Sequence, residues 1–193
     1  SYLGANDLRN QLHSSEAWFR EAVVGANEPN RTPFELVDAE PGERYVTCVP
    51  LLPLRAAAGA FGDPQHVPDD VDSWQWVRLT TGRRLLNGMF VAQVVGRSME
   101  PGLPDGAYCL FCAPVAGSRQ GKTVLAQLRD ATDPETGERY TVKRYFSEKV
   151  AGEDGWRHVR ITLKPTNLSF APIVLEEEDE STVRVIAEVI AVL

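Results

Sequence analysis

The segment MFVAQVVGRSMEPGLPDGAYCLFCA (residues 89–113) contains two apolar runs joined by a polar connection. Both runs are rich in valine, alanine and aromatic residues, which is typical of buried β-strands. The connection holds glycine, proline and aspartate, which favour tight turns. Its one serine, Ser98, is therefore either an ordinary turn residue or a nucleophile held between two strands.

Seven further runs of the same kind lie between Tyr45 and Leu193, separated by clusters of glycine, proline and aspartate. Many short strands with few helices predict a mainly β fold, either a β-sandwich or a partly closed barrel. The seven runs are YVTCV, WQWVRL, TVLAQLR, RYTVKRYF, WRHVRITL, APIVL and TVRVIAEVIAVL.

The chain before Tyr45 has a different character. Residues 1–25 predict a short N-terminal helical segment, because apolar side chains recur there at helical spacing. Residues 26–44 form a polar stretch with three prolines, which predicts a linker. The domain organisation expected is thus a helical segment, a linker, and one β domain over residues 45–193.

The overall composition limits the possible partners. The 193 residues include 20 Lys and Arg against 27 Asp and Glu, a formal net charge of −7. This balance argues against direct nucleic-acid binding, because phosphate contacts need a basic face. No apolar run approaches the ~20 residues that span a bilayer, and no secretory signal opens the chain. We expect no membrane partner and a cytoplasmic location.

The cysteines and histidines do not predict a metal or redox site. The three cysteines fit a reducing compartment. Cys109 and Cys112 form a C-x-x-C pair, but their odd separation points them to opposite faces of a strand. The three histidines, His13, His66 and His158, have no neighbours typical of a catalytic base and are expected at the surface. We therefore expect no metal and no cofactor.

A serine hydroxyl becomes a nucleophile only when a base within hydrogen-bond reach takes its proton. A lysine can be that base where burial keeps it neutral, and the serine–lysine pair is an attested variant of the catalytic triad. Lys143 lies in the strand-like run RYTVKRYF. Alternation places Lys143 on the same face as Thr141 and Tyr145, and that pattern alone predicts the more hydrated face.

The combination of GRSMEP with YTVKRY, in which Lys143 follows Ser98 by 45 residues, resembles the LexA-like serine peptidases. That family includes LexA and phage repressors and shares a fold with bacterial signal peptidases. The resemblance implies that Ser98 is the nucleophile and Lys143 the general base. It also implies that the Ser98 N–H and a neighbouring N–H of its turn stabilise the oxyanion. The residues assigned to this oxyanion site and its turn are Gly96, Arg97, Met99 and Pro101.

LexA-like proteins cut themselves, typically at an Ala-Gly bond ahead of the serine. The region 49–62 contains Ala58-Gly59 after an apolar approach, which makes this bond the candidate cleavage site and this segment the candidate substrate. The other interpretation is an ordinary apolar edge strand that ends in a turn of small residues. Since the lysine must lose its proton to act, the reaction is expected to accelerate at alkaline pH.

Three classes of function remain open: a self-cleaving regulatory module, a peptidase that acts on other chains, and a non-cleaving binding or dimerisation domain. The presence of both Ser98 and Lys143 favours an enzyme, and Ala58-Gly59 favours self-cleavage. Such a module would control an upstream domain or partner in transcription, the SOS response to DNA damage, or defence, with a protein partner as activator. The short helical segment is too small to be a complete helix-turn-helix module.

The last run, residues 182–193, is strongly apolar. Relatives pair this strand across a two-fold axis, and an exposed strand edge invites such pairing. We expect a homodimer formed through this edge. The alternative is that the run is buried within its own sheet.

Overall fold

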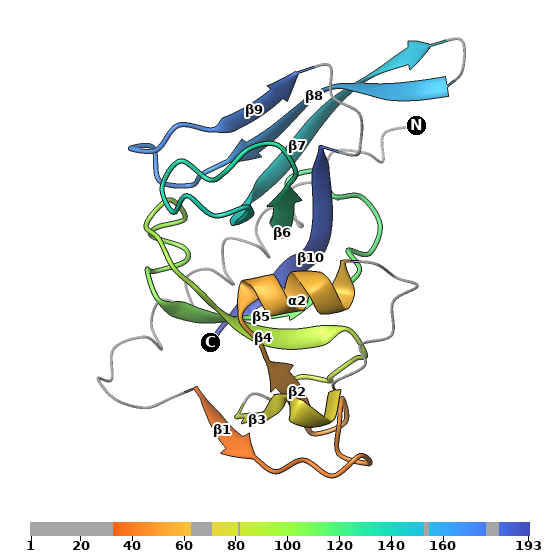
Figure 1. Ribbon diagram of the computed structural model, residues 1–193, viewed down its shortest axis with the longest axis vertical. Coiled ribbons are helices and arrows are strands. Elements are labelled where there is room, and N and C mark those ends of the chain that lie inside the picture. Colours follow the sequence, from red (N-terminus) through yellow and green to blue (C-terminus); the bar gives the residue numbers. More distant parts are fainter. Residues whose placement is uncertain (1–32, 63–70, 81, 153–154, 177–181) are drawn as a thin grey trace, which may run out of the picture. The chain divides into compact units, whose positions relative to one another are not determined.

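The computed structural model describes residues 33–62, 71–80, 82–152, 155–176 and 182–193. The predicted helical segment, residues 1–25, lies outside the described residues. Within them the chain forms ten strands, one α-helix and one short 3-10 helix (Figure 1). The prediction of a mainly β fold is therefore confirmed.

The ten strands form one continuous sheet in the order β1-β3-β2-β4-β5-β10-β6-β7-β8-β9. Neighbouring strands are antiparallel except for the short parallel contact between β2 and β4. Within the described residues β1 and β9 end the sheet, so it is not closed into a barrel. The strands are β1 (Phe34–Val37), β2 (Cys48–Leu51), β3 (Gln75–Leu79), β4 (Met89–Val94), β5 (Ala107–Cys112), β6 (Thr123–Leu128), β7 (Tyr140–Gly152), β8 (Gly155–Lys164), β9 (Ile173–Glu176) and β10 (Val183–Val192).

The first strand lies where the sequence predicted a linker. β1 pairs antiparallel with β3, and Phe34 is buried with its ring edge-on to Tyr108, 4.9 Å between centroids. Part of the stretch 26–44 therefore belongs to the sheet. Four residues after a proline are too few to show an alternating pattern, which is why the strand was missed.

The last strand is not at an edge of the sheet. β10 lies between β5 and β6, with Val183–Glu188 paired to β6 and Glu188–Val192 paired to β5. The expectation of an exposed edge strand was wrong, and the alternative, a strand within its own sheet, is correct. The apolar sequence of β10 reflects this central position, so it does not by itself indicate a dimer interface.

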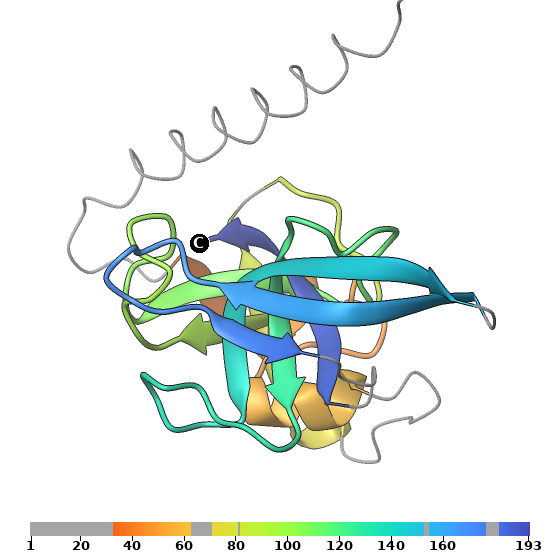
Figure 2. The same cartoon turned by 90° about the horizontal axis from the view of Figure 1, so that it is seen from above.

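Within the described residues the one α-helix is α2 (Leu54–Phe61), which was not predicted. Figures 1 and 2 show it lying across the sheet, and Phe61 begins a stack of three rings: Phe61 on Phe90 at 5.0 Å, and Phe90 on Phe111 at 5.1 Å. Ala57 and Ala58, on the buried side of the helix, belong to the same apolar core. In the part of the chain that the structure describes, no helix has the length and apolar character needed to cross a bilayer.

Candidate active site

Ser98 lies in a tightly bonded turn between β4 and β5. Gly96 starts the turn with φ +112°, a conformation that other residues rarely adopt, and its N–H donates to the Asp105 carboxylate at 2.7 Å. The N–H of Leu103 donates to the Met99 carbonyl at 2.9 Å. Ser98 is only 4% exposed, so the turn carries a serine that is largely withdrawn from solvent.

A second loop fixes the backbone of this turn from outside. The N–H of Asn167 donates to the Ser98 carbonyl, and the Asn167 side-chain amide donates to the Arg97 carbonyl, both at 3.0 Å. The Thr166 hydroxyl donates to the Glu100 carbonyl at 3.3 Å. Because the carbonyls of Arg97 and Ser98 are both bonded, the orientation of the peptide groups around the serine is set.

Lys143 lies near the start of β7, opposite Val124 of β6. It is 4% exposed, and its neighbours on the same face, Thr141 and Tyr145, are equally buried. The alternation argument was therefore wrong about hydration. The reason is that β7 is covered on both faces here, and the connection between β6 and β7 covers the face that carries Lys143.

Asp133 of that connection is the partner of the lysine. The Lys143 Nζ donates to the Asp133 carboxylate at 2.6 Å and to the Thr141 hydroxyl at 2.9 Å. The Thr141 hydroxyl donates to the same carboxylate oxygen. Burial alone would raise the pKa of Asp133, but the hydrogen bonds from Lys143 and Thr141, a backbone N–H and the lysine charge together lower it. The described state is thus a buried ion pair.

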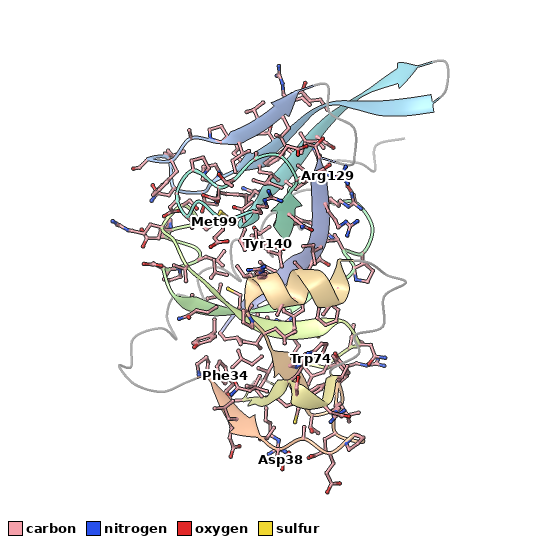
Figure 3. All side chains as sticks on the ribbon, viewed as in Figure 1. Phe34, Asp38, Trp74, Met99, Arg129 and Tyr140 are labelled. Atoms are coloured by element: carbon pink, nitrogen blue, oxygen red, sulfur yellow. The ribbon has the colours of Figure 1, made fainter. Side chains whose placement is uncertain are left out.

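Ser98 and Lys143 line the same small cavity, of about 20 Å³. Met99 and Tyr140, which are labelled in Figure 3, also line it. Among the described residues, no hydrogen bond joins the Ser98 hydroxyl to the Lys143 amine, which bonds to Asp133 and Thr141 instead. A cavity of this size has room for roughly one water molecule and none for a peptide.

The backbone beside Ser98 forms an anion site. The N–H of Arg97 donates to one oxygen of the Glu135 carboxylate at 2.5 Å, and the N–H of Ser98 donates to the other at 3.2 Å. Two adjacent N–H groups that converge on one negative group have the geometry that stabilises an oxyanion. Of the other predicted turn residues, Met99 is buried in the core and Pro101 is exposed.

A groove of about 1000 Å³ adjoins the small cavity. Six residues line both, namely Leu54, Val95, Gly96, Glu135, Thr136 and Tyr140. The candidate cleavage bond lies elsewhere: Ala58 and Gly59 are inside α2, where Ala58 is 5% exposed and its carbonyl accepts from the N–H of Gly62. The structure thus brings Ser98 and Lys143 to one cavity and holds Ala58-Gly59 in a helix.

Cys109 and Cys112 both lie on β5, where Cys109 is buried and Cys112 is partly exposed. Burial raises the pKa of Cys109 to about 12. Burial, and then the nearby Glu188 carboxylate, raise the pKa of Cys112 against the opposing effect of Lys122. In the described part of the chain, no cluster of histidine, cysteine and acidic side chains is arranged to hold a metal ion.

Sequence reasoning missed the two acidic residues of the site. Asp133 and Glu135 lie in the stretch DATDPETGE, which was interpreted only as a hairpin connection. The one available signal was the Asp-Pro-Glu order, since aspartate before proline favours a turn in which its side chain accepts a nearby backbone N–H. That pattern predicts a turn but does not indicate what the turn contacts.

The Peptidase S24-like family model matches residues 50–190. None of the curated proteins compared with the chain matches it significantly. The matched stretch begins within β2 and ends within β10, so it includes α2, the Ser98 turn, the acidic connection and Lys143. Since it is well over half of the 193 residues, the chain belongs to the Peptidase S24-like family, which confirms its resemblance to the LexA-like serine peptidases.

Proposed function

We propose that this domain is a self-cleaving serine peptidase in which Ser98 and Lys143 hydrolyse the Ala58-Gly59 bond. The observation that carries the proposal is one site: a buried serine and a buried lysine on the wall of one cavity, beside two N–H groups that already bind an anion. Each part has a role in acyl transfer, and family membership supplies the reaction class.

The proposed reaction begins when Lys143 has lost its proton. The Ser98 hydroxyl oxygen attacks the carbonyl carbon of Ala58, and its proton passes to the Lys143 amine. The carbonyl oxygen becomes negative and is stabilised by the N–H groups of Arg97 and Ser98. The bond to Gly59 then breaks, and the leaving nitrogen takes the proton from Lys143.

The second half of the reaction releases the acyl group. Water attacks the ester carbonyl and gives one proton to Lys143, and Lys143 passes that proton to the leaving Ser98 oxygen, which frees the serine. The new carboxylic acid on Ala58 loses its proton to solvent and becomes a carboxylate. Lys143 is ion-paired with Asp133, so the proton that it must lose is still in place and the described arrangement is a resting one. Alkaline conditions favour the reaction because they remove that proton.

Delivery of the bond requires α2 to unwind. Leu54 at the start of the helix lines both the cavity and the groove, and Ala58 is four residues further, about 6 Å along a helix axis. The helix has no side-chain cap at Pro53, no acidic residue in its first turn and no basic residue in its last. A helix of eight residues with these ends has marginal stability without tertiary contacts. This supports the proposal that α2 can unwind and move away from its position on the sheet.

The groove favours a second candidate, a peptidase that acts on other chains, because it is large and open beside the site. Four further parts of the proposal rest on family membership and not on any contact in the described residues. They are a homodimer, an activating protein partner, a cytoplasmic location, and a role in transcription, DNA damage or defence. Of these, the activating partner follows most directly from the chemistry, since unwinding α2 and discharging Lys143 both need to be favoured.

The test is incubation of the purified chain at pH 9–10, followed by intact-mass measurement. Self-cleavage yields fragments 1–58 and 59–193, and the Ser98→Ala variant stays whole. Adding wild type to Ser98→Ala protein distinguishes the two candidates: a cut variant shows action on other chains, and a first-order rate independent of concentration shows self-cleavage. A folded wild-type chain that stays intact in both arms would overturn the proposal.

A further inference from the structure

The connection between β6 and β7 contains a compact turn, residues 133–138, that touches both halves of the site. The Asp133 N–H donates to the Glu138 carbonyl and the Gly137 N–H to the Asp133 carbonyl, both at 2.8 Å. One Asp133 carboxylate oxygen accepts from the Glu135 N–H at 2.8 Å, and the other accepts from Lys143. The turn is therefore fixed internally and anchored to the lysine.

The same turn extends its Glu135 side chain to the serine. Both oxygens of the Glu135 carboxylate are engaged, one by the N–H of Arg97 and the other by the N–H of Ser98. These are the two donors that would stabilise the oxyanion of the reaction. A donor that is bonded to a carboxylate is not available to a substrate carbonyl.

Glu135 also lies where the catalytic cavity adjoins the groove. It lines both spaces, so a peptide that approaches Ser98 from the groove meets this carboxylate. Gly96 permits the close approach: a Cβ at that position would lie 2.8 Å from a Glu135 carboxylate oxygen. The backbone beside the serine is thus shaped around the glutamate.

We infer that the turn 133–138 is an inhibitory latch: the Glu135 carboxylate occupies the oxyanion site, and Asp133 holds the Lys143 amine in an ion pair, until the turn is displaced. This inference rests on the proposed function and adds its regulation. The Glu135 carboxylate stands where the negative oxygen of the tetrahedral intermediate would form. A substrate segment, or a partner that moves the turn, has to replace it.

The latch predicts that Glu135→Ala cuts itself faster than wild type. If the latched form outnumbers the open form ten to one, its removal raises the rate about tenfold. Glu135→Gln keeps the shape but loses the charge, so an intermediate increase is expected. Asp130→Ala is the matched control, since Asp130 is an exposed carboxylate on the same connection and lines neither space. The measurement is the half-time of cleavage at pH 9.

A second readout follows the contact without any cleavage. In the Ser98→Ala background, which keeps both N–H groups and cannot cut, hydrogen exchange of the amides at positions 97 and 98 is measured by NMR. Adding Glu135→Ala is expected to speed their exchange and to move their proton resonances upfield, whereas adding Asp130→Ala leaves both unchanged. Thermal unfolding of each variant shows whether the fold is kept.

Faster cleavage together with loss of amide protection supports the latch. Unchanged amides overturn it whatever the rate does, because the contact is then absent. If the amides at positions 97 and 98 lose protection but the cleavage rate is unchanged or lower, the latch is also overturned and Glu135 has a structural role. In that case cleavage by the wild-type chain still supports the proposed function. If all folded variants stay whole, Glu135→Ala included, the proposed function is rejected, and the latch is rejected with it.

Discussion

The cluster around Lys143 and the helix α2 are both buried in this domain, but they are held in opposite ways. Lys143, Asp133 and Thr141 are joined by short, charge-assisted hydrogen bonds, which fix directions as well as positions. α2 is held by Ala57, Ala58 and Phe61 against apolar side chains, and such contacts are not directional.

This difference separates the chemistry from the substrate. In the described arrangement the polar cluster keeps its members in fixed directions, whereas the helix can leave and return at the cost of its apolar contacts. We therefore expect the strand that carries Lys143 to be part of the most stable region and α2 to open more readily. The predictions below test each side of this contrast.

The largest effect is expected at Asp133. Asp133→Asn leaves a buried lysine without its counter-charge, which costs about 3–5 kcal/mol of unfolding free energy when the lysine stays charged. Urea unfolding at pH 7 in the Ser98→Ala background measures the loss. Glu148→Gln, at an exposed pair with Arg160, is the control and should change stability by less than about 0.5 kcal/mol.

Equal stability losses for Asp133→Asn and Glu148→Gln would contradict the expectation that the polar cluster around Lys143 is rigidly held. A double variant tests the same expectation more sharply. Replacing both charged partners, as Asp133→Asn with Lys143→Met, should be less destabilising than the sum of the single changes, because no unpaired charge remains.

A smaller effect is expected in acid. Because the pKa of Asp133 is lowered in the folded chain, this group stabilises the fold fully above the ordinary aspartate pKa of about 3.9. Its contribution is lost as the pH falls through the lower folded value. Unfolding free energy measured between about pH 6 and pH 3 should therefore fall more for the Ser98→Ala protein than for the same protein carrying Asp133→Asn. Parallel curves would show that the ion pair does not persist in solution.

Most of the sheet was predictable from sequence because its strands follow local rules. Nine alternating or apolar runs correspond to β2 to β10, and glycine and proline mark the turns between them. β1 was missed because it is four residues long, and α2 because LRAAAGAF after a proline resembles an apolar turn as closely as a helix. Local patterns do not carry the strand order that places β10 in the middle of the sheet.

The site was predictable only in part for the same reason. Ser98 and Lys143 were found through a paired motif, and the structure puts both on one cavity. Asp133 and Glu135 reach that cavity because their turn packs against the Ser98 turn and Lys143. No spacing in the sequence indicates this tertiary contact.

The smallest effect is expected in α2, where two variants should change the stability of the helix in opposite directions. Ala56 and Gly59 are both exposed on the helix, and a Cβ added at Gly59 meets nothing within 4 Å. Ala56→Gly should destabilise the helix and Gly59→Ala should stabilise it, each by about 1 kcal/mol. If cleavage requires unwinding, the first cuts about fivefold faster and the second about fivefold slower, by intact-mass kinetics at one pH.

Opposite shifts distinguish helix stability from recognition of the cleaved bond, because Gly59 belongs to that bond and Ala56 lies close before it, so a defect in recognition would slow both variants. Hydrogen exchange of the α2 amides in the Ser98→Ala background supplies the matching measurement. Exchange there should quicken with Ala56→Gly and slow with Gly59→Ala, while the amides of β7 around Lys143 stay unchanged. If the α2 and β7 amides respond together, the helix and the catalytic cluster open as one unit, and substrate delivery then requires loosening of the site itself.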